Sequence, residues 1–534
     1  MTAATATWTG SDLAQMRELG IDPEEAERHL SLFRDPPPAV RLDRPATVGD
    51  GILRLGEPER ARLVARAREA QAAGGFVKFV PASGAASRMF RDLEALLHGD
   101  EAENDEGRLF LDRLPDFAFY EDLREALAAD GEDLATLRRE RRLQPILDAL
   151  LTGGRGGRGL GYASLPKALI RFHRYPDERR TAFDEHLVEA MAHVRDGAGL
   201  CRLCFTVSPE HRDGLERRLA AVGPRYAART GSRFEVAWSH QEHATDTLAV
   251  DLEDRPFRTD RGRLLFRPGG HGALLANLQA AGGRVTFVKN IDNVLPDGRK
   301  GEVVEWKLAL AGRLLALRDR AFALVDRLEG GGGDGAEGEE ALLVEAARFL
   351  ADELHRPLPA RLAAAPAGER RRALVDRLDR PLRVAGVVRN VGEPGGGPFW
   401  VAGGMGAEAG ERSLQIVEAS QVDEEDDEQR AVLRSSTHFN PVDLVCSLAD
   451  RRGRPYDLAR FVDPATVFLA EKSHQGRRLK ALERPGLWNG AMAGWNTVFV
   501  EVPLGTFAPV KTVFDLLRPE HQTGVPPASS IRSP

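Results

Sequence analysis

The sequence predicts an α/β protein with a mainly parallel, Rossmann-like mixed sheet in three layers, enlarged by helical insertions. The first observation is an alternation of strand and helix patterns over residues 164–239, namely SLPKALIRF, TAFDEHLVEAMAHVRD, LCRLCFTV, EHRDGLERRLAAV and RFEVAWS. Alternation of this kind favours parallel strands joined by helices. The second is FVKFVPASGAASRMFRDLEALL, where an apolar strand, a turn of small residues and a helix follow one another. That order is typical of an anion-binding βα unit.

Strand patterns return near residue 382 as LRVAGVVRNV, PFWVAGG and SLQIVEAS. From these patterns we expect an N-terminal helical extension at 1–75, with a helix at 58–73, and the first part of the α/β core at 76–300. A helical insertion occupies about 91–162 and ends in the flexible loop GGRGGRGLG at 153–161. A second helical insertion is expected at 301–381, the rest of the core and the C-terminal segment at 382–522, and a disordered tail at 523–534.

The bulk properties describe a globular protein of more than one structural unit. At 534 residues the chain exceeds the usual size of a single core, so two or three units are expected. Apolar residues make up 42% and charged residues 29%, as in ordinary globular proteins. The formal net charge of −7 argues against a nucleic-acid partner, since nucleic-acid-binding proteins usually carry a basic excess.

Targeting signals and cysteine content predict a cytoplasmic protein without a membrane partner. No stretch approaches the ~20 apolar residues that span a bilayer, and the N-terminus MTAATATWTGSDLAQ lacks the features of a signal peptide. The three cysteines, Cys201, Cys204 and Cys446, argue against a disulfide framework and for a reducing compartment. Cys201 and Cys204 would face opposite sides of one buried strand, so we expect a structural role for them and no zinc site.

The small-residue turn is the first candidate for chemistry. Phosphate groups bind where successive backbone N–H groups point the same way and no bulky side chain blocks their approach. Arg88 follows at the expected helix start and could pair with a triphosphate. The alternative is a tight connection between strand and helix with no ligand. The turn consists of Ala82, Ser83, Gly84, Ala85, Ala86 and Ser87.

Three further segments carry candidate residues. Lys167 in LPKALIRFH is one of few lysines in an arginine-rich chain, directly after a glycine loop. The loop RPGGHG allows a backbone to press against a flat ligand, although a simple turn before a helix is the alternative. The strand VTFVKNIDNV delivers polar groups to its C-terminal end, where open α/β sheets bind ligands. The candidates in the last two segments are Gly269, Gly270 and His271, and Asn290, Asp292 and Asn293.

Asp292 is a natural oxygen ligand for Mg²⁺, which prefers carboxylates. The acidic stretch QVDEEDDEQR at 421–430 is different, because adjacent carboxylates on one strand or helix rarely converge. We therefore expect a solvated loop or helix start at 421–430, and no metal site.

Seven segments together resemble the UTP–sugar-1-phosphate uridylyltransferases, the group of UDP-glucose and UDP-N-acetylglucosamine pyrophosphorylases. They occur in the same order as that group's motifs, across roughly residues 76–520. The chain also resembles a bacterial family of about this length, that of the domain of unknown function 4301 (DUF4301), as a remote branch of the group. The segments are PASGAASRM, PKALI, RPGGHGALL, VKNIDNV, VEASQVDEE, HFNPVDLV and TFAPVKTVFDLL.

The resemblance implies the nucleotide-diphospho-sugar transferase fold and a role for each matching position. The stretch from Ala82 to Arg88 would wrap the triphosphate, and Lys167 would lie near the α-phosphate. Gly269, Gly270 and His271 would lie against the nucleobase or its ribose, and Asp292 would bind Mg²⁺. Lys511 would contact phosphate groups in a closed complex. The sugar would be contacted by Asn440 and Asp443, and the candidate substrate-binding set also includes Asn290 and Asn293.

The chain also departs from the pattern of that group. Its loop SGAAS is poorer in glycine, and the aspartate of a PPGHGD-like segment is replaced by Ala273. The loop and the Pro-Lys segment, usually close in sequence, are separated by the insertion at about 91–162. They meet in space only if that insertion is an excursion whose two ends lie side by side.

The function predicted is therefore transfer of a nucleotide, UTP in the first instance, to a sugar 1-phosphate with release of pyrophosphate. The partners would be a nucleoside triphosphate and a phosphorylated sugar, with Mg²⁺ as cofactor. One alternative is a catalytically altered protein that binds nucleotides or nucleotide sugars. Another is a glycosyltransferase that uses a nucleotide sugar, although NIDN supplies one carboxylate where a DxD-type motif would supply two.

Overall fold

The protein's strands and helices fall into two compact units. The computed structural model describes residues 8–84, 86–99, 104–154, 156–331, 335–392, 395–403, 411–423 and 425–524. The first unit comprises residues up to Ala67, Gln241–Phe287 and Ala309–Val502. The second unit comprises Arg68–His240, Val288–Leu308 and the residues from Pro503 onward.

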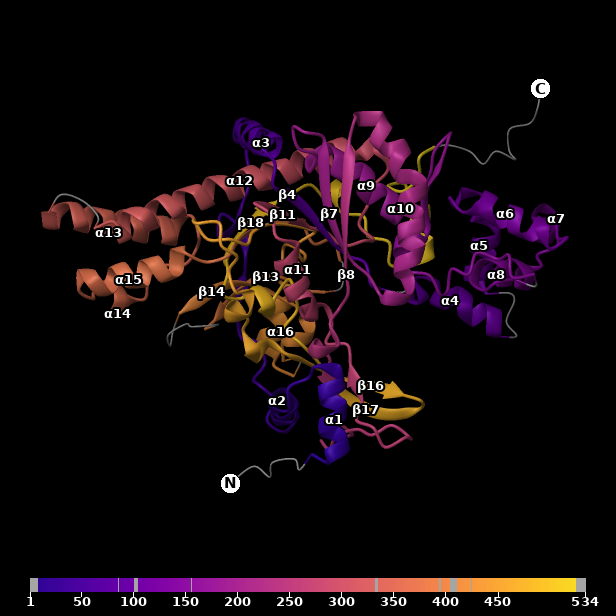
Figure 1. Cartoon of the computed structure of the whole chain (residues 1–534), viewed down its shortest axis with the longest axis horizontal. Helices are drawn as coiled ribbons and strands as arrows, with labels where there is room; N and C mark the ends of the chain where they lie inside the picture. Colours follow the sequence, from indigo (N-terminus) through magenta and orange to yellow (C-terminus); the bar gives the residue numbers. More distant parts are fainter. Residues whose placement is uncertain are drawn as a thin grey trace. The chain divides into compact units, whose positions relative to one another are not determined.

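Nine strands form a mixed, mostly parallel sheet, which confirms the predicted fold class (Figure 1). In the first unit the strand order is β2 (Thr47–Val48), β3 (Gly51–Leu53), β18 (Asn496–Glu501), β12 (Leu382–Val387) and β15 (Asp443–Ser447). All of these pair in parallel except β15, which is antiparallel to β12. In the second unit β4 (Phe76–Pro81), β7 (Leu200–Thr206) and β8 (Arg233–Ser239) are parallel. The ninth strand is β11 (Val285–Val288).

Local sequence explains the strands and helices of the second unit. Phe76 to Val80 of β4 are all buried, as expected of a parallel strand that is covered on both faces. Cys201 and Cys204 are buried free thiols in β7, as predicted. Helix α9 (Ala182–His193) begins at Thr181, whose hydroxyl accepts the N–H of Asp184 while the Asp184 carboxylate accepts the N–H of Thr181. This reciprocal cap satisfies two backbone donors and fixes the start of the helix.

Helix α10 (Pro209–Thr230) extends further than the sequence pattern predicted. The pattern EHRDGLERRLAAV ends before Gly223 and Pro224, which usually stop helices. The helix continues because Leu215, Val222 and Tyr226 form one buried face across the proline. Burial of that face outweighs the lost backbone hydrogen bond, and the helix ends at Gly231 in the left-handed conformation.

The predicted insertion at about 91–162 is helical. It contains most of α4 (Ser87–His98) and then α5 (Asp105–Arg113), α6 (Tyr120–Ala129), α7 (Leu134–Arg139) and α8 (Leu143–Leu151), which gather into one group (Figure 1). The Pro-Lys segment that follows differs from the expected long strand. Lys167–Leu169 forms a 3₁₀ turn, and the strand β5 covers only Arg171–Arg174, paired with β6 (Arg179–Thr181).

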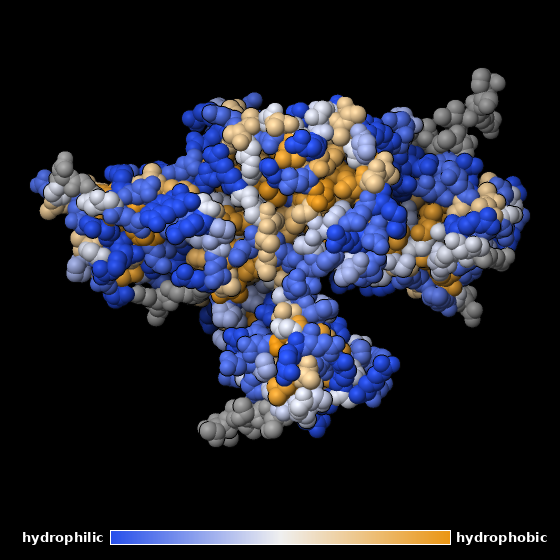
Figure 2. All heavy atoms as spheres, in the orientation of Figure 1, coloured by the Kyte–Doolittle hydropathy of each residue, from blue (hydrophilic) through white to orange (hydrophobic). Residues whose placement is uncertain are grey.

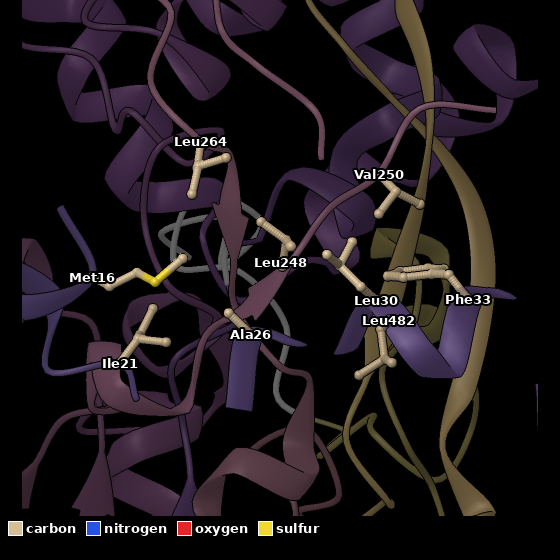
Figure 3. Close-up of a cluster of buried hydrophobic side chains, with 9 residues drawn as sticks. All are labelled: Met16, Ile21, Ala26, Leu30, Phe33, Leu248, Val250, Leu264 and Leu482. Atoms are coloured by element: carbon tan, nitrogen blue, oxygen red, sulfur yellow. The ribbon is translucent and has the colours of Figure 1, made fainter. Parts of the chain in front are cut away.

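The N-terminal helices of the first unit close a small apolar cluster (Figure 3). Helix α1 (Gly10–Leu19) begins with a reciprocal cap between Thr9 and Asp12, and α2 (Pro23–Arg34) begins at the capping residue Asp22. Their buried faces pack against β9 (Thr247–Leu248), β10 (Phe266–Arg267) and nearby segments. The cluster consists of Met16, Ile21, Ala26, Leu30, Phe33, Leu248, Val250, Leu264 and Leu482.

The rest of the first unit contains a small sheet, a hairpin and several helices. Strand β13 (Gly397–Ala402) pairs with both β1 (Leu42–Pro45) and β14 (Arg412–Val417), and β16 (Phe468–His474) pairs with β17 (Arg477–Glu483). Helix α13 (Gly335–Asp352) packs against α15 (Ala367–Leu378). The remaining helices are α11 (Leu275–Ala281), α14 (Ala360–Ala363) and α16 (Asp427–Arg434), and α3 (Glu57–Ala72) and α12 (Asp297–Glu329) each contribute residues to both units.

The face drawn in Figure 2 is mostly hydrophilic. Among the described helices, none combines the length and the apolar composition that a membrane crossing requires. The acidic stretch at 421–430 contains a helix start, as predicted, because Asp426 caps α16 through the N–H groups of Glu428 and Gln429.

Leu30→Ala should destabilise the first unit, because Leu30 is fully buried in the cluster of Figure 3. The substitution removes buried apolar surface and leaves a cavity, with an expected loss of about 2–5 kcal/mol in the free energy of unfolding. Urea denaturation followed by circular dichroism measures the loss. The control is Leu13→Ala on α1, whose side chain is exposed, and equal stability of the two variants would contradict the prediction.

Candidate functional site

The carboxylate of Asp292 is shared by two lysines in the second unit. Its Oδ2 accepts hydrogen bonds from Lys167 Nζ and from Lys511 Nζ, each at 3.0 Å. Lys167 Nζ also donates to the carbonyl of Val510 at 2.7 Å, and the N–H of Val510 donates to the carbonyl of Asp292 at 3.1 Å. Three sequence-predicted residues, spread over 345 positions from Lys167 to Lys511, therefore meet at one carboxylate.

Burial and charge act in opposite directions on this group. Burial would raise the pKa of Asp292, but the ammonium groups of Lys511 and Lys167 outweigh it and hold that pKa below its usual value. Burial lowers the pKa of Lys167, and Asp292 only partly offsets the effect. The Lys511 side chain is 63% exposed, whereas that of Lys167 is 13% exposed. The cluster thus carries two positive charges and one negative charge, with one ammonium group open to solvent.

Asp292 retains one oxygen that could bind a metal. Its Oδ1 is buried and has no hydrogen-bond partner among the described residues. No group of three or more His, Cys, Asp or Glu side chains suited to a metal occurs in the described part of the chain. Mg²⁺ commonly binds through one or two carboxylates, with phosphate oxygens and water completing the octahedron. One carboxylate oxygen therefore fits a magnesium ion that arrives together with a phosphate ligand.

The turn after β4 leads into a helix start without a side-chain cap. Ala86 precedes α4 and forms no side-chain cap, and the first turn of α4 contains no acidic residue. The backbone N–H groups of Ser87 and Arg88 have no partner among the residues that the structure describes. A β-carbon added to Gly84 would meet no atom within 4 Å, so this side of the turn is open. Such a helix start attracts anions, because its N–H groups and its dipole both favour negative charge.

The two ends of the helical insertion lie side by side at this turn. The N–H of Ala86 donates to the carbonyl of Leu165 at 2.9 Å, and the N–H of Lys167 donates to the carbonyl of Gly84 at 3.4 Å. The insertion is therefore an excursion that returns to its starting point. Its return brings the Pro-Lys segment next to the small-residue turn, the arrangement that the resemblance required.

The other residues expected at the triphosphate are placed less specifically. Arg88 is exposed, and no described residue forms an ion pair with it. Ser83 lies beside α10, where its carbonyl accepts a hydrogen bond from the Ser208 hydroxyl at 3.2 Å. Ala82 is buried and donates its N–H to the carbonyl of Thr206. Ala85 lies outside the described residues.

A second carboxylate, Glu189 on α9, is surrounded by three lysines that the motif analysis did not identify. Lys78 Nζ lies 2.9 Å from Glu189 Oε1, Lys289 Nζ lies 2.9 Å from Oε2, and Lys307 Nζ lies 3.7 Å from Oε1. All four side chains are at most 1% exposed. Burial lowers the pKa of Lys78 to about 7 despite the nearby Glu189, whereas the lysines hold the pKa of Glu189 well below its usual value despite burial.

The Glu189 cluster supports both parts of the candidate site. Lys78 belongs to β4, which leads into the small-residue turn, and Lys289 lies three residues before Asp292. The N–H of Lys289 also donates to the carbonyl of Phe79 at 3.2 Å. In addition, His186 Nε2 lies 3.2 Å from the carbonyl of Ile291, next to Asp292. These contacts fix the position of the small-residue turn after β4 relative to the segment that carries Asp292.

The rarity of lysine was a signal that could have found this cluster. The chain contains 74 Lys and Arg residues, of which eight are lysines. Six of the eight belong to the second unit, and all six contact one of three buried carboxylates. The third carboxylate is Glu185, which is paired with Lys300 and accepts hydrogen bonds from Tyr175 and Arg180.

In the first unit, the glycines of PGGHG pack against the chain itself. A β-carbon at Gly269 would lie 2.6 Å from the carbonyl oxygen of Thr245, and one at Gly270 would lie 2.9 Å from the Glu483 carboxylate. His271 Nδ1 accepts the N–H of Leu487 at 2.9 Å, and its ring stacks on that of Trp488. These contacts by themselves account for the glycines and the histidine, so the role at a nucleobase stays a prediction.

The four residues expected to contact the substrate, Asn290, Asn293, Asn440 and Asp443, differ in their burial and in their hydrogen bonds. Asn293 is buried, and its side-chain carbonyl accepts the N–H of Ala508 at 3.1 Å, which ties it to the C-terminal segment. Asn290 is exposed beside it. In the first unit Asp443 is buried at the start of β15, and Asn440 Oδ1 is buried without a partner among the described residues. Contact with a sugar stays a prediction for all four.

Glu189→Gln should destabilise the second unit strongly. The substitution leaves three buried ammonium groups without their counter-charge, which should lower the free energy of unfolding by about 3–5 kcal/mol. Chemical denaturation measures the change. Glu210→Gln on α10, an exposed position, is the matched control with an expected change within about 0.5 kcal/mol. A Glu189→Gln protein as stable as this control would show that the cluster does not hold the unit together.

The chain can be compared with known proteins. The structure of UDP-N-acetylglucosamine pyrophosphorylase from Trypanosoma brucei is 13% identical, with a TM-score of 0.47, over 96% of this chain and 79% of that chain. UDP-glucose pyrophosphorylase from Leishmania major is 13% identical, with a TM-score of 0.41 and the same coverage. No curated protein matches in sequence. The family model described as a domain of unknown function, DUF4301, matches residues 9–522, and the chain therefore belongs to the DUF4301 family.

Proposed function

We propose that this protein is a nucleotidyltransferase that joins a nucleoside triphosphate, UTP in the first instance, to a sugar 1-phosphate and releases pyrophosphate. The observation that carries the proposal is the buried Asp292 carboxylate held between the ammonium groups of Lys167 and Lys511. The backbone of Lys167 is hydrogen-bonded to the turn that starts α4, so the lysines and the uncapped helix start belong to one site. The ordered motifs of the sequence support the same reaction.

The charges of this site suit a polyanionic substrate. Two ammonium groups and one carboxylate leave a net positive charge, and the N-terminus of α4 adds N–H groups that no described residue accepts and that suit incoming anions. Arg88 is exposed at that helix start and is available to a phosphate oxygen. Two reacting phosphates repel each other, so a transferase must supply fixed positive charge to hold them together.

In the proposed reaction an oxygen of the sugar 1-phosphate attacks the α-phosphorus of the nucleotide, and pyrophosphate leaves from the opposite side. Lys167 is fixed by Asp292 and by the Val510 carbonyl, so its ammonium group would stabilise charge on the α-phosphate without rearranging. Lys511 lies on the C-terminal segment with an exposed ammonium group, which can turn from Asp292 toward a bound phosphate. Asp292 would hold Mg²⁺, which neutralises phosphate oxygens when it is bound.

Asp292 orients the two lysines as well as offering an oxygen for the metal. Because its Oδ2 is shared by both ammonium groups and its Oδ1 has no partner among the described residues, one carboxylate can serve both purposes. The backbone at Lys511 is held by a contact that does not involve Asp292. The Asp515 carboxylate accepts the backbone N–H groups of Lys511 and Thr512 at 2.8 and 2.7 Å.

A second candidate function is nucleotide binding without catalysis. The observation that favours it is the small-residue turn itself, whose segment SGAAS at 83–87 is poorer in glycine than the loop of the resembling enzymes. Isothermal titration with UTP, combined with a pyrophosphate-release assay, separates the two functions. Binding without release in the presence of sugar 1-phosphates would favour the binding protein.

Lys511→Ala should keep the fold but lose turnover. The side chain is largely exposed, so stability should change by no more than about 0.5 kcal/mol, while loss of one fixed charge should lower kcat about 10²-fold. The assay is pyrophosphate release in a screen of nucleoside triphosphates against sugar 1-phosphates. The control is Lys472→Ala, a partly exposed lysine of the β16–β17 hairpin. Unchanged kcat in Lys511→Ala, or an equal loss in the control, would refute the role of Lys511.

Asp292→Ala and Lys167→Ala should each abolish measurable turnover in the same assay. Asp292→Ala removes the proposed metal ligand and also leaves the two ammonium groups to repel each other. Circular dichroism and thermal unfolding show whether each variant is folded. A folded Asp292→Ala protein with the activity of the unchanged chain would contradict the proposed metal position.

A further inference from the structure

A cavity of about 490 Å³ in the first unit brings several arginines together with an apolar wall. Its volume lies within the range of pockets that hold small organic molecules. The apolar part comprises Ala351, Pro357, Leu358 and Pro359. Two carboxylates, Asp50 and Glu411, also line it, and the cationic and aromatic side chains of the lining are Arg44, Arg356, Arg377, Arg412, His355 and Trp400.

Arg356 is a buried cation whose charge is only partly offset, by the carboxylates of Asp376 and Glu411. Its Nη1 donates to the carbonyls of Gly494 and Trp495, at 3.0 and 3.2 Å. No carboxylate of the described residues forms an ion pair with it. Burial, together with the nearby guanidinium groups of Arg380 and Arg377, lowers the pKa of Arg356 to about 9. A desolvated charge that is only partly offset is unfavourable, so an anionic ligand at this position would stabilise the protein.

Arg380 adds to the excess of positive charge at the same carbonyl. Its Nη1 donates to the carbonyl of Gly494 at 3.2 Å, and it also forms an ion pair with Asp376 at 2.6 Å. Two guanidinium groups therefore converge on one backbone oxygen, and Asp376 forms an ion pair with Arg380 alone. Guanidinium groups gathered in this way are the usual protein contribution to a phosphate site.

Two other arginines of the cavity, Arg44 and Arg412, are held by acidic residues. Arg44 pairs with Asp50 at 2.8 Å and with Asp43 at 2.6 Å, and Arg412 pairs with Asp43 at 2.9 Å. The guanidinium group of Arg44 also lies over the Trp400 ring, 5.0 Å from its centre. These contacts fix the shape of the cavity, whereas Arg356 supplies a charge that no ion pair among the described residues neutralises.

His355 gives an independent sign of a ligand site. It adopts a left-handed backbone conformation, with φ of +52°, which is strained for a residue other than glycine. Its Nε2 is buried and has no hydrogen-bond partner among the described residues, and its ring meets Trp400 edge to face. Strained residues with unsatisfied polar atoms are found preferentially where a ligand binds.

We propose that this cavity binds a small organic phosphate ester, with the phosphate on Arg356 and the organic part against the wall formed by Pro357, Leu358 and Trp400. The lining supports this class of ligand, because inorganic phosphate would leave the apolar wall uncovered and a neutral molecule would add nothing to the partial neutralisation of Arg356. The site belongs to the first unit, and Lys167, Asp292 and Lys511 belong to the second. It therefore constitutes a second ligand site, built from residues other than those of the proposed transferase site.

Isothermal titration of the full-length protein with phenyl phosphate tests the proposal, because this probe carries both a phosphate and a flat apolar group. Arg356→Gln should weaken binding about tenfold or more, since one charge-assisted hydrogen bond is lost. The matched control is Arg361→Gln, five residues along the chain and paired with Glu369 outside the cavity; its affinity should equal that of the unchanged protein. Inorganic phosphate and phenol, titrated separately, should each bind more weakly than phenyl phosphate.

Two further variants make every outcome decisive. Arg412→Gln changes another arginine of the cavity at a largely exposed position, so it tests the site if Arg356→Gln fails to fold, and it should also weaken binding. Lys511→Ala should leave the affinity unchanged, because Lys511 belongs to the proposed transferase site. The proposal is overturned if the unchanged protein does not bind phenyl phosphate. It is also overturned if folded Arg356→Gln or Arg412→Gln binds normally, or if Lys511→Ala alone abolishes binding.

Discussion

The second unit depends on buried carboxylates that each hold lysine ammonium groups from distant parts of the chain. Glu189 contacts Lys78 on β4, Lys289 directly after β11, and Lys307 on helix α12. A buried charge must be paired, since leaving it alone in a medium of low polarity is strongly unfavourable. The three segments therefore have to meet at Glu189, and the turn after β4 and the corner at Asp292 are positioned as a result.

The same arrangement at Asp292 differs in one respect that matters for chemistry. The ammonium groups around Glu189 are sealed from solvent, whereas Lys511 beside Asp292 is exposed. A sealed cluster maintains geometry, and a cluster open on one side can exchange its contacts for those of a ligand. Lysine suits this position because its ammonium group is a compact charge on a flexible stem, which can turn toward a phosphate as a rigid guanidinium fork cannot.

Much of the fold could be predicted from local pattern. The strand from Phe76, the capping residue Thr181 and the buried run around Cys204 are visible in the sequence, because they depend on periodicity and capping alone. The end of α10 was not predictable in this way, since its continuation through Pro224 depends on packing against residues far away in sequence. Tertiary burial determined that element, not local propensity.

The candidate site shows a similar division. Lys167, Asp292 and Lys511 could be found because each lies in a recognisable segment, and the structure brings them to one carboxylate. Glu189 could not, because one glutamate in the pattern TAFDEHLVEAMAHVRD resembles any solvent-facing residue of a helix. The glycines of the PGGHG loop illustrate the opposite case: their close neighbours are parts of the same chain, Thr245 and Glu483, and pattern alone does not distinguish a backbone neighbour from a ligand.

The paired backbone hydrogen bonds that close the insertion between Gly84 and Lys167 have an evolutionary consequence. Because these hydrogen bonds join residues on either side of the insertion, the intervening helices can lengthen, shorten or be exchanged among relatives while the backbone of the turn keeps its shape.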